Sequence, residues 1–350
     1  MFRRLLYILP LKGNFNLRNF FMIFSISFLI CTFLAGCSEN DDSIPELLDD
    51  NWEKKTITKI VENGYADGMF VDYSEANKIS YTMDDLWRTL EIYNSIGYNY
   101  QQDLLLEKII NLELNGLKEE LQFSYLCFKY LDNGCSIEIE INPTIEEILN
   151  SEYDTMETLD LVYFIVSYYY DNINNNSKIN IMKWIESNAT VIKKDIGLIY
   201  TVLSIQDKMG VEIIEFENRE LYKHLLKNTI EEPDSDLIEL YYLYFINYYL
   251  QNEIDENYVF TGVLKYFDQD SGFSLSKHYY LDANLGTFIA INILNEIGKI
   301  GSLKKDIMTI AEKLETNYGL FINKENIPTG TIEETIMGYY VLQILGEVKK

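Results

Sequence analysis

The stretch Ser271-Gly272-Phe273 decides the fold, together with the apolar segment DANLGTFIAINILNEIG at residues 282–298. Glycine reaches backbone angles that other residues disfavour, so Gly272 indicates a turn. The aromatic ring of Phe273 is suited to fill the seam between two packed elements. The apolar segment has the length of a helix, and Gly298 is the residue type that often ends one. The stretch therefore predicts a turn followed by a buried helix.

The same unit recurs elsewhere in the chain. YGLF at residues 318–321 precedes the apolar segment 331–346, and GMF at residues 68–70 precedes the segment 83–97. Apolar segments of helical length fill most of the rest, strand-like alternation is scarce, and only five prolines occur. The sequence therefore predicts an all-α fold. The predicted helices cover residues 83–96, 104–112, 117–131, 155–170, 179–186, 196–209, 221–226, 237–250, 259–267, 282–297, 303–314 and 332–345.

Two kinds of predicted helix alternate, most clearly in the second half of the chain. Residues 303–314 place their apolar side chains on one narrow stripe, which is typical of a helix with one face in water. Residues 159–170 and 237–250 are apolar nearly all round, which is typical of a helix covered on both sides. Helices of the second kind begin near residues 83, 117, 155, 196, 236, 282 and 331, at a spacing of 34 to 49 residues.

That spacing is typical of a helical-hairpin repeat. We therefore expect residues 56–350 to form a single domain with the architecture of an α/α toroid. In this arrangement about six helical hairpins form a closed ring, with the doubly covered helices inside and the amphipathic helices outside. An open α-solenoid is the alternative.

The repeated unit has a further pattern, in which a glycine-aromatic turn precedes a helix with a threonine near its start and an Ile-Gly or Leu-Gly end. The residues that carry it are Gly272, Phe273, Thr287, Leu294, Ile297 and Gly298, and then Gly319, Phe321, Thr335, Leu342, Leu345 and Gly346. This pattern resembles the repeats of the terpenoid cyclase and protein prenyltransferase superfamily. The resemblance implies an α/α toroid.

The catalytic motifs of that superfamily do not accompany the resemblance. Its prenyltransferases hold zinc with an Asp, a Cys and a His, and its triterpene cyclases use an Asp-x-Asp-Asp acid. Here the only histidines are His224 and His278, the cysteines Cys127 and Cys135 lie far upstream of the matching repeats, and Asp-x-Asp-Asp does not occur. We therefore expect no metal and no cofactor, and the sequence favours a protein that is not an enzyme.

The amino terminus has the features of a targeting segment. Basic residues precede a 16-residue apolar run at residues 20–35, and Leu34-Ala35-Gly36-Cys37 closes it. This arrangement looks like the lipobox of bacterial lipoproteins, in which the cysteine receives a diacylglycerol and becomes the new amino terminus. The resemblance implies a signal peptide at residues 1–36, lipidation of Cys37, and a location on the outer, extracytoplasmic face of the cell membrane. An uncleaved transmembrane anchor is the alternative, although the run is shorter than the ~20 residues of a spanning helix.

The charge of the chain restricts its partners. Four Lys or Arg and no Asp or Glu precede Cys37, so the net charge of −26 becomes −30 after cleavage. Such a chain is not expected to bind nucleic acid, because it lacks a basic stripe to replace phosphate counterions. It would also be repelled by an anionic bilayer surface, so the lipid has to hold it at the membrane. Residues 37–55 are expected to form a short acidic tether.

Two cysteines remain after Cys37, namely Cys127 and Cys135. An extracytoplasmic compartment permits a disulfide between them. Since pairing cannot be deduced from sequence, we expect two free buried thiols and keep the disulfide as the alternative.

Tyrosine suggests a ligand-binding pocket, because 28 occur and several gather in two predicted inner helices. Buried phenols seek hydrogen bonds, so Tyr168, Tyr241 and Tyr248 are candidates to line an aromatic pocket. Such a pocket would suit a carbohydrate, a peptide or another small molecule. Packing of these rings in the core, with their hydroxyls between helices, is the alternative.

Acidic residues gather at the starts of the predicted inner helices, where a toroid would place them on one rim. Asp282 and Glu334 are therefore candidate site residues, and His278 is the histidine nearest such a cluster. A converging pair of carboxylates could act as acid and base on a polysaccharide. Capping of helix amino termini is the alternative. The acidic residues are Asp84, Asp85, Asp154, Asp234, Asp236, Asp282, Glu333 and Glu334.

The sequence thus favours a membrane-anchored extracytoplasmic lipoprotein with a toroidal pocket that binds a ligand or partner without catalysis. The alternative is a polysaccharide hydrolase or lyase that uses the rim carboxylates. Asp268 and Asp270, beside the Gly272 turn, could hold a cation, but an ordinary polar turn is the expectation.

Overall fold

The computed structural model describes residues 83, 86–90, 114–130, 139–214, 216–277, 283–314 and 332–347. The chain divides into two units, Met1–Asp50 and Asn51–Lys350, and all described residues lie in the second. The expected signal peptide at residues 1–36, Cys37, the tether at residues 37–55 and the start of the helical domain at residue 56 lie outside the described residues.

The described part is built almost entirely from helices, as the sequence predicts, with one small hairpin of two-residue strands. Residues 83 and 86–90 are also helical. The elements are α6 (Leu117–Tyr130), α7 (Ile141–Asn150), α8 (Thr155–Tyr168), η3 (Tyr170–Asn172), α9 (Asn175–Ile192), α10 (Ile196–Met209), α11 (Arg219–Glu231), α12 (Leu237–Tyr249), α13 (Glu256–Leu264), β1 (Phe267–Asp268), β2 (Gly272–Phe273), α14 (Ala283–Glu296), η4 (Ile300–Ser302), α15 (Lys304–Leu314) and α16 (Ile332–Glu347).

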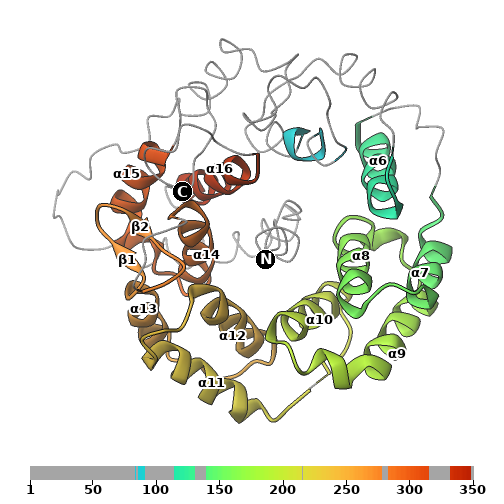
Figure 1. Ribbon diagram of the computed structural model, residues 1–350, viewed down its shortest axis with the longest axis horizontal. Helices are drawn as coiled ribbons and strands as arrows, with labels where there is room; N and C mark the ends of the chain where they lie inside the picture. Colours follow the sequence, from blue (N-terminus) through green and yellow to red (C-terminus); the bar gives the residue numbers. More distant parts are fainter. Residues whose placement is uncertain are drawn as a thin grey trace, which may run out of the picture. The chain divides into compact units, whose positions relative to one another are not determined.

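The helices of this unit form two layers. α8, α10, α12, α14 and α16 contact one another in that order. α7, α9, α11 and α15 pack against this series, and α13 packs against α11. Figure 1 shows the first series on the inner side of a curved row and α7, α9, α11, α13 and α15 outside it. The predicted alternation of inner and outer helices is therefore confirmed for the described helices from α7 to α16.

The burial of each layer follows from its sequence. In α12, ten residues between Leu237 and Asn247 are buried, and they lie on every side of the helix. The reason is that α12 packs between α10, α11 and α14. In α11 the buried residues are Tyr222, Leu226, Thr229 and Ile230, which repeat at the three- and four-residue spacing of one helical face. The inner helices therefore form the core, and the outer helices separate it from water.

The turn at Gly272 is the tight connection that the sequence predicts. Gly272 has φ +86°, a conformation that L side chains rarely adopt. It opens β2, which pairs antiparallel with β1, and Phe273 is fully buried beside Phe267 at a ring-centroid distance of 4.8 Å. A Cβ atom on Gly286 would lie 2.3 Å from the Phe273 carbonyl oxygen, so α14 packs directly against the backbone of the hairpin.

The segment after β2 is tied to the end of α11 and the start of α12. The Leu237 N–H donates to the Leu275 carbonyl at 2.9 Å. Lys277 Nζ lies 2.8 Å from Ser235 Oγ, which is 2.9 Å from the Tyr266 hydroxyl. Lys277 also donates to the carbonyl oxygens of Thr229 and Glu232, and partial burial lowers its pKa. One lysine thus satisfies carbonyls at a helix end that have no partner within the helix.

Two expectations from the sequence differ from the structure. α7 was not predicted, although Ile141, Ile145 and Ile148 bury one face of it. Cys127 is 2% exposed and disulfide-bonded, so the expectation of a free thiol is wrong for this residue. Cys135, the other cysteine of that expectation, lies outside the described residues.

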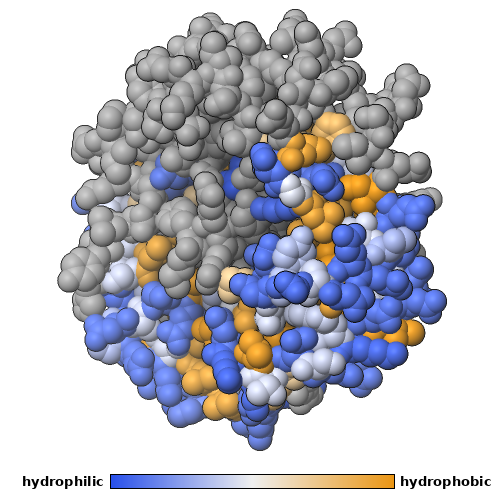
Figure 2. Space-filling model, turned by 45° about the vertical axis from the view of Figure 1, so that its right-hand side comes forward, coloured by the Kyte–Doolittle hydropathy of each residue, from blue (hydrophilic) through white to orange (hydrophobic). Residues whose placement is uncertain are grey.

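On the face drawn in Figure 2, the described residues are mainly hydrophilic, with separate hydrophobic areas among them. Large apolar residues at the surface, such as Ile179 at 50% exposed and Val191 at 46%, are outer-layer positions on α9. Among the described residues, no helix is both long and apolar enough to cross a bilayer.

Candidate functional site

The predicted site residues fall into different environments. Tyr168 in α8 is half-buried, Tyr241 in α12 is fully buried, and Tyr248 near the end of α12 is 49% exposed. Glu334 in the first turn of α16 is half-buried. His278, Asp282 and the lipidation residue Cys37 lie outside the described residues.

Tyr241 belongs to a buried tyrosine pair between two inner helices. Its hydroxyl lies 3.1 Å from the hydroxyl of Tyr200 in α10, and the two rings meet edge-on with centroids 5.5 Å apart. Burial raises the pKa of both phenols well above 10.0. The pair therefore stays neutral at physiological pH and joins α10 to α12.

Tyr248 presents an aromatic ring at the surface of the inner layer. The ring is held by Phe245, at a centroid distance of 6.1 Å, and by Tyr249, at 5.8 Å. Both neighbours meet it near a right angle, at 68° and 74°. An exposed ring fixed by two others offers a rigid contact surface at low cost in conformational entropy.

Four hydroxyl groups gather between α8, α10 and α12, and we call them the hydroxyl cluster: Tyr163 and Ser167 of α8, Ser204 of α10, and Tyr249 of α12. Tyr249 donates to Ser204 Oγ at 3.4 Å. Burial raises the pKa of Tyr163 to about 12, and the nearby hydroxyls of Ser204 and Ser167 partly oppose this shift. Three consecutive inner helices therefore contribute to one group of neutral donors and acceptors.

Two members of the hydroxyl cluster have no hydrogen-bond partner among the described residues. These are Tyr163 Oη and Ser167 Oγ, both of which are buried. Neither reaches the geometry of a hydrogen bond with its neighbours, although they lie close enough to affect the pKa of Tyr163. Buried polar atoms are nearly always satisfied in folded proteins, so these two positions require a water molecule or a ligand.

The charges next to the hydroxyl cluster are of both signs. Lys208 Nζ lies 5.5 Å from the centre of the Tyr163 ring. Asp207, the preceding residue in α10, is exposed and raises the pKa of Tyr249 together with the larger effect of burial. The cluster thus has no strong preference for one sign of charge.

Tyr168 is part of a separate aromatic group that joins α8 to α6. Its ring lies 4.9 Å from Trp87, 5.1 Å from Tyr125 and 4.7 Å from Phe164. The first two contacts are edge-on, the arrangement that aromatic quadrupoles favour. For Tyr168 the structure supports the packing alternative.

The described carboxylates at the starts of inner helices act as caps. Asp154 accepts a hydrogen bond from Glu157 N at 2.8 Å, and Asp236 accepts one from Glu239 N at 2.6 Å. Asp195 does the same for α10. The capping alternative is therefore confirmed for Asp154 and Asp236.

Backbone hydrogen bonds also occur at the other polar residues that the sequence analysis singled out. The carbonyl of Glu334 accepts from the Asn284 side chain at 2.6 Å, which links α16 to α14. Asp268 Oδ1 accepts from the backbone N–H groups of Asp270 and Ser271, and these bonds lower its pKa. The polar-turn expectation is thus confirmed. The described residues include no group of three or more His, Cys, Asp or Glu that could hold a metal ion.

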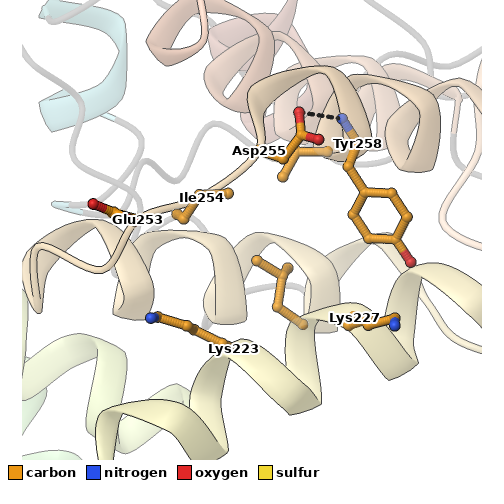
Figure 3. A pocket seen from close by; sticks show the side chains of 8 residues that line it. Lys223, Lys227, Glu253, Ile254, Asp255 and Tyr258 are labelled. Atoms are coloured by element: carbon orange, nitrogen blue, oxygen red, sulfur yellow. Dashed lines mark hydrogen bonds between the residues drawn. The ribbon is translucent and has the colours of Figure 1, made fainter.

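A cavity of about 310 Å³ opens between α11 and α13 on the outer layer. Its floor is apolar, and Figure 3 shows Lys223 and Lys227 on one side with Asp255 and Tyr258 on the other. The lining residues are Lys223, Leu226, Lys227, Glu253, Ile254, Asp255, Tyr258 and Val259.

Most of the charges around this cavity are already paired. Lys223 lies 2.8 Å from Glu220, and Lys227 lies 3.9 Å from Glu231. The Tyr258 hydroxyl donates to Glu231 at 2.9 Å, and Asp255 caps α13. The cavity therefore offers mainly its apolar floor, and surface pairs of this kind contribute little energy to binding.

The sequence alone did not identify the hydroxyl cluster. Tyr163, Ser167 and Ser204 each stand singly in apolar helices, and only the packing of α8, α10 and α12 brings them together. The sequence does contain a signal for it, namely Ser167 and Ser204 in two predicted helices that are apolar nearly all round. A buried hydroxyl needs a hydrogen-bond partner, so such serines indicate a polar contact inside the core.

A scan against protein-family models and searches of the curated proteins and of the solved structures found no match to this chain.

Proposed function

We propose that this protein is a lipid-anchored binding protein on the extracytoplasmic face of a bacterial membrane. In this proposal the two layers of helices close into an α/α toroid, and the inner layer presents the ligand-binding face. The observations that support it are the exposed ring of Tyr248 near the end of the inner helix α12, and two buried hydroxyls of the inner helix α8, Tyr163 Oη and Ser167 Oγ, which have no hydrogen-bond partner among the described residues. Ligand sites commonly combine aromatic side chains with a few placed polar groups.

Binding without catalysis is favoured by the roles of the carboxylates. Asp154, Asp195 and Asp236 hold the amino-terminal N–H groups of their helices, so each would have to leave its cap to act as an acid or base. A polysaccharide hydrolase or lyase would therefore depend on the remaining rim carboxylates, of which Asp282 and Glu334 are the candidate site residues. Analysis of products after long incubation with a polysaccharide separates the two functions, because a binding protein releases the substrate unchanged.

The proposed location has two supports. The Leu34-Ala35-Gly36-Cys37 sequence has the form of a lipidation site. The disulfide at Cys127 is a bond that persists in oxidising compartments outside the cytoplasm. Metabolic labelling of bacterial cells with palmitate should mark the wild-type protein and not Cys37→Ser. Label on Cys37→Ser, or its absence from both proteins, would refute the anchor.

The binding face is tested with a panel of ligands of different chemistry. We expect one class among neutral oligosaccharides, acidic oligosaccharides and short peptides to raise the melting temperature of the soluble form that begins after Cys37. Tyr248→Ala should weaken that binding about tenfold or more, because a planar group stacked on one aromatic ring contributes about 1–3 kcal/mol, the range known for nucleic-acid bases.

The matched control is Tyr153→Ala. Tyr153 is 38% exposed but lies between α7 and α8, away from the end of α12. Equal binding by wild type and Tyr153→Ala, with loss in Tyr248→Ala, supports the proposed face. Binding by no class, or equal binding by all three proteins, overturns it.

A further inference from the structure

We propose that the cavity between α11 and α13 binds a short free peptide with apolar side chains, whose charged ends meet charged groups on the two walls. The cavity lies on the outer layer, so this inference goes beyond the proposed function and does not depend on Tyr248. Three properties of the cavity carry the inference: its walls are fixed, its floor is apolar, and the lining residues of its two walls differ in charge.

The two walls of the cavity are tied together at both ends of α11. The Asn252 side chain donates to the carbonyl of the first residue of α11 at 3.3 Å, and the Tyr258 hydroxyl donates to Glu231, the last residue, at 2.9 Å. A Cβ atom on Gly262 would lie 2.8 Å from Ile230 Cγ1, so α13 packs closely on α11 beyond the cavity. The cavity is therefore preformed, and a ligand does not have to order its walls.

The floor of the cavity selects a ligand with apolar side chains. Leu226 of α11 forms it together with Ile254 and Val259 of the opposite wall. The volume of about 310 Å³ is at the small end of the range for ligand pockets. A ligand with one or two apolar side chains suits this space, and covering the floor removes apolar surface from water.

The charged residues that line the cavity have opposite signs on its two walls. Lys223 and Lys227 lie one helical turn apart on α11. Glu253 and Asp255 belong to the segment that leads into α13, on the other side of the cavity (Figure 3). A ligand between the walls is thus exposed to ammonium groups on one side and to carboxylates on the other.

These charged groups have capacity for a ligand. The ammonium group of Lys227 lies 3.9 Å from Glu231, which is longer than a hydrogen bond. The two bonds by which Asp255 caps α13 both end on Oδ1, which leaves Oδ2 as an acceptor. Glu253 is exposed. Because exposed ion pairs contribute little free energy, a ligand can replace them at low cost.

A zwitterion is the class of ligand that matches both walls. The carboxylate of a free peptide can bind the two lysines, its ammonium group can bind Glu253 and Asp255, and its side chains can cover the floor. An apolar anion would be repelled by the acidic wall and by a chain of net charge −26, and an apolar cation by the lysines. A zwitterion has no net charge and avoids both penalties.

Calorimetry with four dipeptide probes tests the ligand class on the soluble form that begins after Cys37. We expect leucylphenylalanine to bind with a Kd of ~1 mM or lower. Acetylation of its amino end, or amidation of its carboxyl end, should each weaken binding about two- to fivefold, the effect of one exposed ion pair. Diglycine lacks apolar side chains and should bind more than about tenfold more weakly.

Variants of the two walls test the place of binding. The double variants Lys223→Gln/Lys227→Gln and Glu253→Gln/Asp255→Asn should each weaken leucylphenylalanine about two- to fivefold. The amidated peptide should be insensitive to the first pair and the acetylated peptide to the second, because each has already lost the end concerned. Asparagine at position 255 keeps an acceptor for the cap of α13.

The matched control is the double variant Lys183→Gln/Glu186→Gln. It makes the same kinds of change at exposed positions of α9, which does not line the cavity. The control should bind leucylphenylalanine as wild type does, and the melting temperatures of all three double variants show that each is folded.

Three outcomes would overturn the inference. One is no binding of leucylphenylalanine at millimolar concentration. Another is equal binding by wild type and both wall variants, which would place the peptide elsewhere on the molecule. The third is equal binding of the free dipeptide and of a dipeptide blocked at both ends, which would show that only the apolar side chains are recognised. None of these outcomes bears on the Tyr248→Ala test of the proposed function, because that test concerns a different residue and layer.

Discussion

The hydroxyl oxygens of Tyr200 and Tyr241 lie 3.1 Å apart in the interior between α10 and α12. Both side chains are fully buried, so this contact is made where water does not compete for either group. It joins two inner helices at a point where their surfaces are otherwise apolar or aromatic.

Tyr241→Phe should destabilise the protein by about 1 kcal/mol, because it removes the hydrogen bond between the Tyr241 and Tyr200 hydroxyls inside the core. The free energy of unfolding in urea measures the effect. Tyr200→Phe should cost a similar amount. The double variant should lose less than the sum of the two, since both hydroxyls are then gone. Strict additivity would show that the two hydroxyls do not interact.

Stability should fall steeply as the pH rises above 10. Burial raises the pKa of Tyr163, Tyr222 and Tyr266 to about 12, and it raises the pKa of Tyr200 and Tyr241 well above 10. In the unfolded chain these phenols ionise near 10, so above this pH the unfolded state binds fewer protons than the native state. The slope of unfolding free energy against pH is then negative, and stability is lost.

Absorbance at 295 nm during alkaline titration should show a group of tyrosines that ionise only as the protein unfolds. Tyr163→Phe should make the loss of stability above pH 10 less steep, because one phenol no longer contributes. Ionisation of all tyrosines near pH 10 in a protein that remains folded would contradict the burial of these side chains.

Gly286→Ala should destabilise the protein by about 1–3 kcal/mol, the usual cost of overpacking. The new methyl group would lie 2.3 Å from the Phe273 carbonyl, and backbone atoms cannot move aside as a flexible side chain does. Gly301→Ala is the control, since its Cβ would meet nothing within 4 Å. Thermal denaturation compares the two. Equal melting temperatures would mean that α14 does not pack on the hairpin as closely as described.

Asp236→Ala should cost about 1 kcal/mol of stability, because it removes the side chain that caps α12. Asp236→Asn keeps an acceptor oxygen and should cost much less. Chemical denaturation of the two variants measures the difference. If instead Asp236→Asn abolished an enzymatic activity at unchanged stability, the carboxylate would have a catalytic role.

Cys127 should be found in a disulfide-linked peptide after proteolysis without reductant. Alkylation of the denatured, unreduced protein should leave Cys127 unmodified, and reduction before alkylation should expose it. Reduction should also lower the stability by roughly 2–4 kcal/mol, the typical contribution of a disulfide. Alkylation of Cys127 without reduction would restore the free-thiol expectation.

The positions of most helices could be predicted, because the residues that the structure buries recur in the sequence at the spacing of a helix. α10 was predicted at its observed bounds, and α8 and α12 end within two residues of the predicted ends. α7 was not predicted, and it carries Pro143 in its first turn. Proline is tolerated in the first turn of a helix, where its missing N–H has no intrahelical partner.

The candidate site could be predicted only in part. Tyr248 was identified from composition and is exposed, whereas Tyr168 and Tyr241 came from the same pattern and pack in the interior. Whether a tyrosine is exposed or buried depends on the neighbours that its ring contacts. In a helix that is apolar on every side, the sequence does not show which face meets those neighbours. The close packing at Gly286 could have been predicted from the sequence. Glycine inside a helix is unfavourable, so its presence there indicates that another element packs against the helix backbone.

The order in which the inner helices touch has a consequence for biosynthesis. Because α8, α10, α12 and α14 each contact the next along the chain, most of the structure forms between neighbours in sequence. Contacts of this kind close short loops and assemble quickly, and an array of hairpins can grow from any nucleated pair. On the proposed export route the chain would cross the membrane unfolded, and each hairpin could then pack on the one that had crossed before it.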